Sequence, residues 1–432
     1  SSPQPQTLNF KLQTSNLKPI QMKNKRISDN LIILILGALS TITPFAIDMY
    51  LPAFSQIAED FNTTPARISL SVTSYFIGLA LGQMIYGPLL DRFGRKKPLY
   101  VGLTIYMITS IGCMQAQTIE ALVVLRFIQA LGGCVAWVAA LAMARDFFPV
   151  EQSARIFSLL VLVIGLSPLL APTLGGFIAT GLGWQWVFLV LAILTFLILI
   201  VVVLFLPEGH PADPGISLKA GPMLATFWSI LKHPQFFTYS LAGAFSFSSL
   251  FIYVAGSPVI FMEIFKVTPE VYGGIFALLS VGFIGGSQLN IWINRTYKSE
   301  QIFHIALIVL VTTSIVFLWG AWNDWYGLIE TIVLFFIALT CLGLTNPNAN
   351  ALSLAPFTKN VGSASALLGF LQIGIAGLAS GGVGLFNATN SVPVALIMTI
   401  SSAFALFLLI IGKKKIISEV KVSAGSTSSA LH

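Results

Sequence analysis

Apolar runs long enough to cross a lipid bilayer recur throughout this chain of 432 residues. A helix needs about 20 predominantly apolar residues to span the hydrocarbon core. Only 9% of the residues are charged, whereas a soluble domain carries about 25% because its surface faces water. Pro/Gly and charged clusters separate the runs, so we interpret them as helices and not as barrel strands. The sequence therefore predicts an all-α polytopic membrane protein.

The runs number twelve and divide into two groups of six of nearly equal length. The predicted spans are roughly 30–54, 65–88, 98–116, 119–144, 154–180, 184–206, 235–262, 270–293, 300–321, 326–351, 360–387 and 390–412. The predicted organisation is a tail at 1–29, a six-helix bundle at 30–206, a linker at 207–234, a second bundle at 235–412 and a tail at 413–432. A shift of 204 residues places Gly78 and Gly82 on Gly282 and Gly286. This repeat favours two pseudo-symmetric halves around a site at the membrane midplane.

The distribution of Lys and Arg predicts the orientation. With a cytoplasmic N-terminus, the inner segments hold twenty of these residues and the outer loops only Arg67 and Lys266. Both termini are therefore expected in the cytoplasm, with the protein in a bacterial inner membrane. The formal charge of +7 follows from these short clusters, so we expect no nucleic-acid partner. Residues 1–21 differ in composition from the rest of the chain. Met22 is therefore the expected natural start, and a native tail is the alternative.

The three cysteines, Cys113, Cys134 and Cys341, all fall inside apolar runs. We expect them to be small, reduced packing residues. No Cys/His cluster has the spacing of metal ligands, so neither a metal nor a cofactor is expected. A nucleophile–base pair and a nucleotide-binding loop are also missing from the sequence. The protein is therefore not expected to be an enzyme, and an ion gradient is its expected energy source.

The most specific segment is GPLLDRFGRKKP at 87–98. The positive-inside rule accounts for its basic residues, but not for Asp91 or for its glycines. A carboxylate beyond a helix end can cap a neighbouring helix, and an adjacent Arg92 or Arg95 can hold it in place. Gly94 permits a tight turn. Together with Gly87, these residues form a candidate conformational latch.

This loop resembles the G-x-x-x-D-R-x-G-R-K motif of the major facilitator superfamily, which lies between its second and third helices. The resemblance implies the fold of that superfamily, with twelve transmembrane helices in two six-helix bundles. The segment LVVLRFIQALGG at 122–133 is similar to the fourth-helix motif, whose Arg lies near the coupling site. Arg126 is about two turns inside its span, where a charged residue usually faces a cavity or a partner. An Arg that snorkels to the interface is the alternative.

The segment GLSPLLAPTLGG at 165–176 resembles the fifth-helix motif associated with antiporters. Pro168 and Pro172 lack amide donors and should bend the helix. Small residues such as Gly175 allow another helix to approach closely. The resemblance implies an antiporter element formed by Gly165, Pro168, Pro172, Gly175 and Gly176, whereas the residues themselves indicate only packing and a kink.

The segment IDMYLP at 47–52 resembles the first-helix motif of the bicyclomycin-resistance (Bcr/CflA) drug:proton antiporters. Asp48 is the only acid deep in the twelve spans, and Arg126 is its expected partner. As a structural residue Asp48 would stay ionised and paired; as a coupling residue it would change protonation when access alternates. Burial disfavours its charge and a nearby arginine favours it, so we expect coupling. Glu330, nearer the outer interface, is the rival carboxylate.

The substrate cavity is expected to be lined by aromatic and uncharged polar side chains. For the aromatic candidates, core packing or contact with lipid is the alternative; the amides are costly to bury without partners. The candidates are Tyr50, Tyr75, Gln129, Trp137, Phe247, Tyr253, Asn346, Asn350 and Gln372.

Two functional classes fit these features. The first is a proton-coupled secondary transporter that exports drugs or other small amphipathic compounds by alternating access. The second is an exporter of one metabolite, such as a siderophore, or a proton-coupled nutrient symporter. Arg126 is the only intramembrane basic residue, which favours neutral or weakly charged substrates over anions. The expected partners are a small molecule, protons and the bilayer, and we expect a monomer.

Overall fold

The computed structural model describes residues 28–148, 150–215, 220–357, 361–384, 390–414 and 416. The parts of the terminal tails beyond these ranges lie outside the described residues, and so does Met22, the expected natural start. Helices of the first half are α1 (Asp29–Asp48), η1 (Leu51–Ala53), α2 (Phe54–Asp60), α3 (Pro65–Phe93), α4 (Lys96–Met114), α5 (Ile119–Phe147), α6 (Val150–Leu182) and α7 (Gln185–Phe205). Then come α8 (Ala220–Leu231), α9 (Pro234–Pro258), η2 (Val259–Ile264), α10 (Pro269–Ile293), α11 (Ser299–Trp322), α12 (Leu328–Leu354), α13 (Val361–Gly384) and α14 (Val392–Lys413).

These helices confirm the predicted all-α fold, and each of the twelve predicted spans overlaps a long helix. Ten helical segments of the described chain are long and apolar enough to cross a membrane. Several begin at a hydroxyl side chain that accepts a hydrogen bond from the first turn: Thr64 from Arg67 N, Thr118 from Ala121 N and Thr268 from Val271 N. Such N-caps satisfy amides that have no partner within the helix.

The first predicted span is not one continuous helix. The α-helix ends at Asp48, and a short 3-10 turn begins at Leu51 before α2 continues. Pro52 lies in that turn and has no N–H to donate to the carbonyl of Asp48. The break therefore falls beside the one acid that the sequence placed deep in the membrane.

The glycine repeat marks equivalent helix crossings in the two halves. In the first half, a Cβ at Gly78 would lie 2.5 Å from Phe127 O of α5, and one at Gly82 would lie 2.6 Å from Cys134 Cβ. In the second half, a Cβ at Gly286 would collide with Thr340 O of α12. Helices α3 and α10 thus approach α5 and α12 closely at matching positions, as small residues in membrane helices allow.

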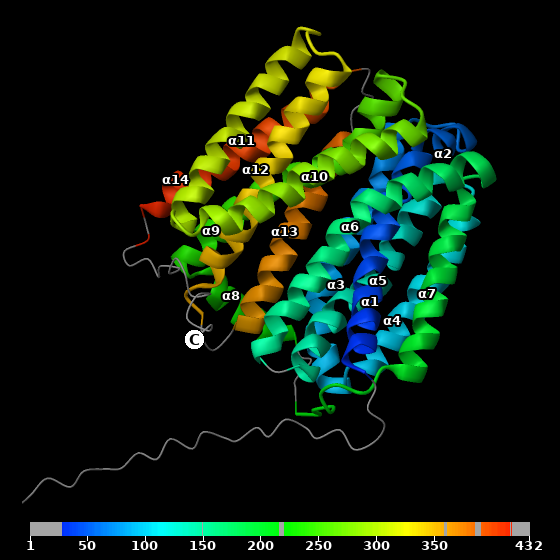
Figure 1. Ribbon diagram of the computed structural model, residues 1–432, viewed down its shortest axis with the longest axis vertical. Coiled ribbons are helices and arrows are strands. Elements are labelled where there is room, and N and C mark those ends of the chain that lie inside the picture. Colours follow the sequence, from blue (N-terminus) through cyan, green and yellow to red (C-terminus); the bar gives the residue numbers. More distant parts are fainter. Residues whose placement is uncertain are drawn as a thin grey trace, which may run out of the picture.

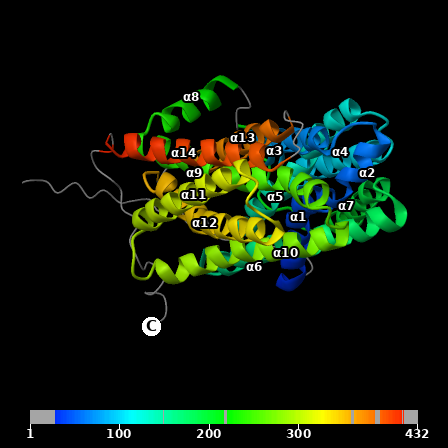
Figure 2. The same cartoon turned by 90° about the horizontal axis from the view of Figure 1, so that it is seen from above.

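The two bundles lie side by side, with α3, α6, α10 and α13 between them (Figures 1 and 2). Helix α3 packs along α13: Gly377 lies against Phe76, and Gly381 and Ser380 lie against Thr73. Helix α6 packs along α10, where Gly273 lies against Thr173 and Gly176 against Pro269. These contacts involve the ends of α3 and α10 that the charge distribution predicts to be outside.

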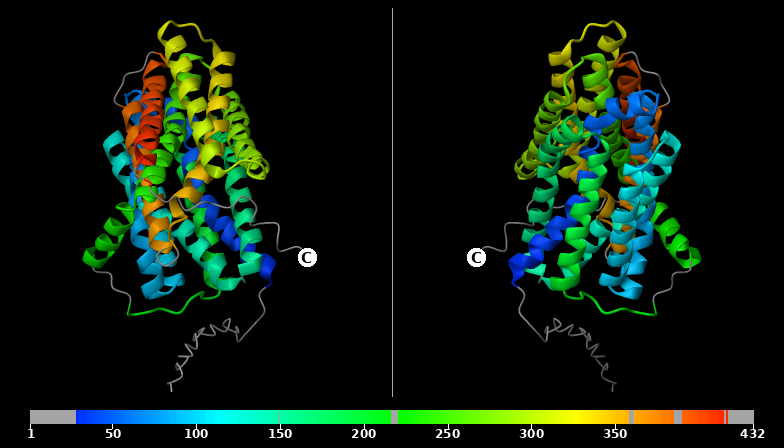
Figure 3. Two further views of the ribbon diagram at one scale, coloured as in Figure 1. Left: turned by 90° about the vertical axis from the view of Figure 1, so that its left-hand side faces the viewer. Right: turned by 90° about the vertical axis from the view of Figure 1, so that its right-hand side faces the viewer.

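Contact between α3 and α13 does not continue to the opposite end. It extends as far as Gln83 and Gly369, which touch. One turn farther along α3, a Cβ at Gly87 would meet no atom within 4 Å, and the same holds for Gly362 of α13. The bundles are therefore packed together on the side predicted to be extracellular, and open space surrounds Gly87 and Gly362 toward the other side, which carries α8 and the start of α1 (Figure 3).

Candidate functional site

Arg126 is fully buried in the centre of the first bundle. Its Nη1 donates to Gln129 Oε1 at 2.7 Å, and its Nη2 donates to the carbonyl of Ala46 at 3.0 Å. Gln129 in turn donates to Ser110 Oγ at 2.7 Å. Arg126 and Gln129 lie one turn apart on α5. The hydrogen bond to Gln129 therefore helps to hold the guanidinium in position to bind α1.

Aromatic rings cover the remaining faces of the guanidinium. Its carbon lies 4.2 Å from the ring centre of Tyr75, 4.8 Å from that of Tyr50 and 5.7 Å from that of Phe188. The hydroxyl groups of Tyr50 and Ser71 are hydrogen-bonded at 2.9 Å. Three of the predicted cavity residues, Tyr50, Tyr75 and Gln129, therefore meet around Arg126. They hold its charge with π faces and neutral oxygens, and among the described residues no carboxylate lies within 4.0 Å of its nitrogens.

Asp48 is 6% exposed and lies at the last turn of α1. From the described residues, no hydrogen bond or ion pair reaches its carboxylate. It lies within electrostatic reach of Tyr253 in α9 and Tyr272 in α10. Tyr272 shares a hydrogen bond of 2.8 Å with Ser257, whereas the buried hydroxyl of Tyr253 has no hydrogen-bond partner in the described structure. Asp48 thus lies at the end of α1 next to the second bundle, because the η1 turn that follows it packs on α9 and α10.

The predicted pairing of Asp48 with Arg126 is absent: within the described chain, no Asp48 oxygen is within 4.0 Å of an Arg126 nitrogen. The guanidinium binds Ala46 O, two residues before Asp48. The Arg126 guanidinium of α5 thus contacts the backbone of the segment of α1 that carries Asp48, but not the Asp48 carboxylate.

A second group of predicted residues meets in the C-terminal bundle. Gln372 Nε2 of α13 donates to Asn350 Oδ1 at 2.6 Å and to Asn346 Oδ1 at 3.2 Å, both on α12. For two of the aromatic candidates the contacts are with other rings: Phe247 packs on Phe251, and Tyr253 stacks on Phe276. Trp137 is half-buried on α5. The nine candidates therefore fall into separate groups.

Sequence reasoning missed a neighbouring polar chain. Asn348 Nδ2 donates to Asn290 Oδ1 at 2.5 Å, and Asn294 and Ser299 extend the chain toward the predicted cytoplasmic end. Asn348 and Asn290 are buried. These two amides could have been noticed in the sequence, because an amide inside an apolar run requires a hydrogen-bond partner. The sequence did not show which helix supplies that partner.

The proline-containing segment of α6 packs on the break in α1. Pro168 and Pro172 both lie within α6. A Cβ at Gly175 would collide with the carbonyl of Met49, the residue after Asp48, and Gly176 lies against Pro269 of α10. Gly165 lies in the same helix, outside the residues whose side chains are described. The small-residue face that the sequence predicted is therefore what lets α6 approach the Asp48 segment.

The candidate latch loop forms an ion cluster whose composition differs from the prediction. Arg95 donates to Asp91 at 2.5 Å and to Asp146 of α5 at 2.8 Å. The amides of Arg95 and Lys96, at the start of α4, donate to Glu208 Oε1 at 2.6 and 3.1 Å. Glu208, not Asp91, caps the neighbouring helix. Burial opposes the charge of Arg95, but the hydrogen bonds and charges of Asp146 and Asp91 raise its pKa, so it remains a cation.

Two further residues of this loop have local roles. Gly94 adopts φ +82°, a left-handed conformation that favours glycine. Arg92 lies 5.8 Å from the ring centre of Phe93. Asp146 and Glu208 were missed because they lie 51 and 113 residues from Arg95 in the sequence.

Glu330, the rival carboxylate, lies at the exposed start of α12. Its Oε2 accepts a hydrogen bond from Gly327 N at 3.0 Å. This is a helix-capping contact, and it is remote from the buried polar groups around Arg126.

Comparison with known proteins agrees with the fold. A family model described as Major Facilitator Superfamily matches residues 36–381. The chain is 32% identical over 374 residues to the uncharacterized MFS-type transporter YdgK of Bacillus subtilis, covering 85% of this chain and 92% of the relative. It is 29% identical over 382 residues to the bicyclomycin resistance protein homolog of Haemophilus influenzae, covering 87% and 94%.

The chain is also 30% identical over 343 residues to the multidrug resistance protein MdtL of Escherichia coli, covering 78% of this chain and 84% of that protein. Among solved structures, that of a D-xylose–proton symporter has a TM-score of 0.70 at 15% identity, covering 87% and 97%. At that identity the likeness concerns the fold. The chain therefore belongs to the Major Facilitator Superfamily, and within it to the bicyclomycin-resistance (Bcr/CflA-like) group.

Proposed function

We propose that this protein exports drugs and other small amphipathic compounds from the cytoplasm in exchange for protons. The main support for this proposal is the position of Asp48, at the point where α1 breaks between the two bundles. Its carboxyl group is nearly buried and has no ion-pair partner in the described chain. The names of the relatives, one a bicyclomycin resistance homolog and one a multidrug resistance protein, support export of antibiotics.

The proposed cycle uses the different surroundings of Asp48. With the outer side closed, Asp48 faces Tyr253 and Tyr272 of the second bundle. Separation of the bundles on the outer side removes these neighbours and lets water reach the carboxylate, which then takes a proton. Because a buried carboxylate without a partner is costly, protonation favours return to the closed outer side. The proton is released toward the cytoplasm when substrate binds.

Substrate would bind between the Arg126 group and the amide cluster of Asn346, Asn350 and Gln372. The Arg126 group contributes aromatic rings and the amide cluster contributes neutral oxygens and amide donors, a combination suited to uncharged or weakly charged compounds. Exchange requires that proton and substrate binding oppose each other. We propose transport, not a chemical conversion, with the proton gradient as the only energy source and a monomer as the working unit in a bacterial inner membrane.

The test is Asp48→Asn in proteoliposomes that contain a pH-sensitive dye. In the wild type, addition of an effluxed antibiotic should drive proton release; Asp48→Asn should abolish it, since the amide cannot ionise. Asp324→Asn is the matched control, because Asp324 lies in an exposed outer loop and its φ of 53° suits Asn. Unchanged proton-driven transport by Asp48→Asn would exclude the proposed coupling role.

The direction of proton movement separates the two functional classes. Substrate-driven proton release supports antiport, whereas substrate uptake together with protons would support the alternative, a nutrient symporter. A response to one metabolite alone, across a panel of drugs and siderophores, would support a dedicated exporter.

A further inference from the structure

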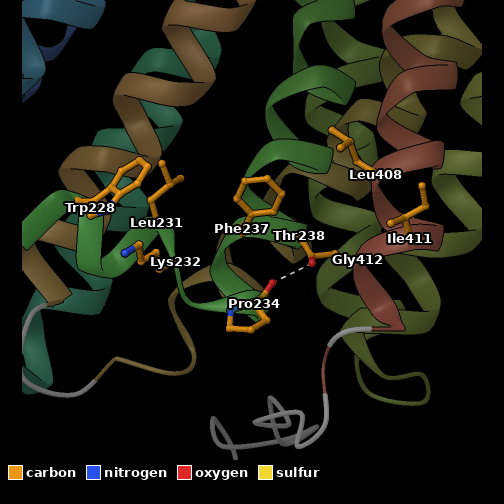
Figure 4. A pocket seen from close by; sticks show the side chains of 9 residues that line it. All are labelled: Trp228, Leu231, Lys232, Pro234, Phe237, Thr238, Leu408, Ile411 and Gly412. Atoms are coloured by element: carbon orange, nitrogen blue, oxygen red, sulfur yellow. Dashed lines mark hydrogen bonds between the residues drawn. The ribbon is translucent and has the colours of Figure 1, made fainter.

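A pocket of about 350 Å³ lies far along the second bundle from the Asp48 region, between α8, α9 and the end of α14. Figure 4 shows Trp228, Leu231 and Lys232 on the α8 side, opposite Phe237 of α9 and Leu408 and Ile411 of α14. Pro234, Thr238 and Gly412 complete the lining. Apart from Lys232 and the Thr238 hydroxyl, these side chains are apolar.

The outer wall of this pocket faces the bilayer. Trp228 is 59% exposed, Phe237 43% and Ile411 42%. Large apolar side chains exposed on the outer surface of a membrane-spanning bundle contact lipid. Tryptophan prefers the interface between the acyl chains and the headgroups. An apolar pocket open to a bilayer is filled by lipid chains, because hydrocarbon and not water is the surrounding solvent.

One lysine lines the pocket, and a second follows the end of the helix that forms its opposite wall. The ammonium of Lys232 lies 5.3 Å from the ring centre of Trp228. Lys414 is exposed directly after the end of α14, two residues beyond the lining residue Gly412. In the described chain neither has a carboxylate within 4.0 Å, whereas Lys413 is paired with Glu300. The rim therefore carries uncompensated positive charge on the face that the Lys/Arg distribution predicts to be cytoplasmic.

Helix α8 forms one wall of the pocket and is part of the connection between the two bundles. Phe227 and Ile230, three residues apart, pack against Phe236 of α9 and Leu367 and Leu368 of α13. Leu224 and Trp228 of the same helix are exposed. An exposed tryptophan on a helix that flanks the bundle indicates a position at the membrane interface, which tryptophan prefers.

We propose that this pocket binds an anionic phospholipid of the cytoplasmic leaflet. One acyl chain lies along Phe237, Leu408 and Ile411, and the phosphate lies between Lys232 and Lys414. The lipid fills the space between α8 and α14 and braces the interbundle connection against the second bundle. A neutral phospholipid offers the same chains but no net charge for the two lysines, so the site selects anionic headgroups.

The test is native mass spectrometry of the full-length protein purified from bilayers of equimolar phosphatidylglycerol and phosphatidylcholine. The wild type should retain phosphatidylglycerol with a preference of roughly thirtyfold, the size expected of two lysines near an anionic headgroup. The double variant Lys232→Gln/Lys414→Gln should lose this preference while its elution volume and thermal stability without lipid are unchanged. Equal retention of both lipids by the wild type would overturn the proposal.

Lys298→Gln is the matched control, since Lys298 is exposed on the same bundle but does not line the pocket. It should retain the wild-type preference. An equal loss in Lys298→Gln would mean that net charge attracts the lipid without this pocket, and would overturn the assignment. Displacement of the bound lipid by inorganic phosphate alone would also contradict it, because the apolar walls are expected to hold the acyl chain.

Discussion

At the scale of single residues, Arg126 shows how a permanent charge is kept inside a membrane bundle without a carboxylate. Amide and carbonyl oxygens accept two of its hydrogen bonds, and the rings of Tyr50 and Tyr75 cover its faces. The sequence indicated that the residue is functional and in need of a partner. It suggested Asp48, whereas the fold supplies Gln129 and a backbone carbonyl.

This geometry predicts that Arg126→Lys is not a conservative substitution. A lysine cannot donate to Gln129 and Ala46 simultaneously from a planar group, nor stack on two rings. Hydrogen bonds to charged groups are worth about 1.5–3 kcal/mol each, so we expect at least roughly a tenfold loss of transport in the proteoliposome assay. The control is Arg67→Lys, whose ion pair with Glu120 is solvent-exposed and should change transport by less than about twofold. Transport at the wild-type rate by Arg126→Lys would show that the fork geometry is dispensable.

At the scale of helices, α6 is adapted to the break in α1. Its small residues lie where a larger side chain would meet backbone: Gly175 against Met49 and Gly176 against Pro269. Ala171 and Ala179 on the same face are fully or almost fully buried. The sequence predicted this small-residue face and a bend at the two prolines. It did not predict that the face contacts Met49, the residue that follows Asp48.

We expect Gly175→Ala to disturb the closed outer side, because its methyl group would collide with the carbonyl of Met49. Backbone cannot move aside as a flexible side chain can, and overpacking of this kind costs roughly 1–3 kcal/mol. Thermal unfolding in detergent should show the loss, and transport should fall with it. Gly181→Ala, on the same helix with open space around it, should unfold at or above the wild-type temperature. Equal stability of the two variants would contradict the close approach of α6 to α1.

At the scale of the whole molecule, the two bundles meet through α3 with α13 and through α6 with α10. On the outer side, Ser55 also donates to Glu263 of the second bundle at 2.6 Å. On the other side, a Cβ at Gly87 or at Gly362 would meet no atom within 4 Å. This arrangement is one state of an alternating-access transporter, in which the bundles must separate on the outer side for the cycle to continue.

A disulfide across the outer contact should therefore stop transport. The hydroxyl oxygens of Thr73 and Ser380 are 3.3 Å apart, close enough for cysteines at these positions to cross-link. The oxidised Thr73→Cys/Ser380→Cys protein should lose transport and recover it on reduction. The native cysteines are free and buried, so oxidised wild type is the control and should remain active. Full activity of the cross-linked protein would show that the outer contact need not open.

The sequence by itself determined the features that depend on local composition and spacing. Hydrophobic length fixed the twelve helices, and the glycine spacing marked the close crossings of α3 and α10. Asp48 and Arg126 were identifiable because isolated charges in apolar runs are costly unless a structure supports them. Amides in an apolar run likewise pointed to Asn346, Asn350 and Gln372, which the fold brings together.

Only the tertiary structure decided which groups these residues meet, because such partners come from helices far apart in the chain. It turned Asp48 toward Tyr253 and Tyr272, some 200 residues away, and gave Arg126 neutral partners. It placed Glu208, not Asp91, at the start of α4. Helix directions and packing of the bundles select these contacts, and spacing along a sequence carries no information about which faces of distant helices will meet.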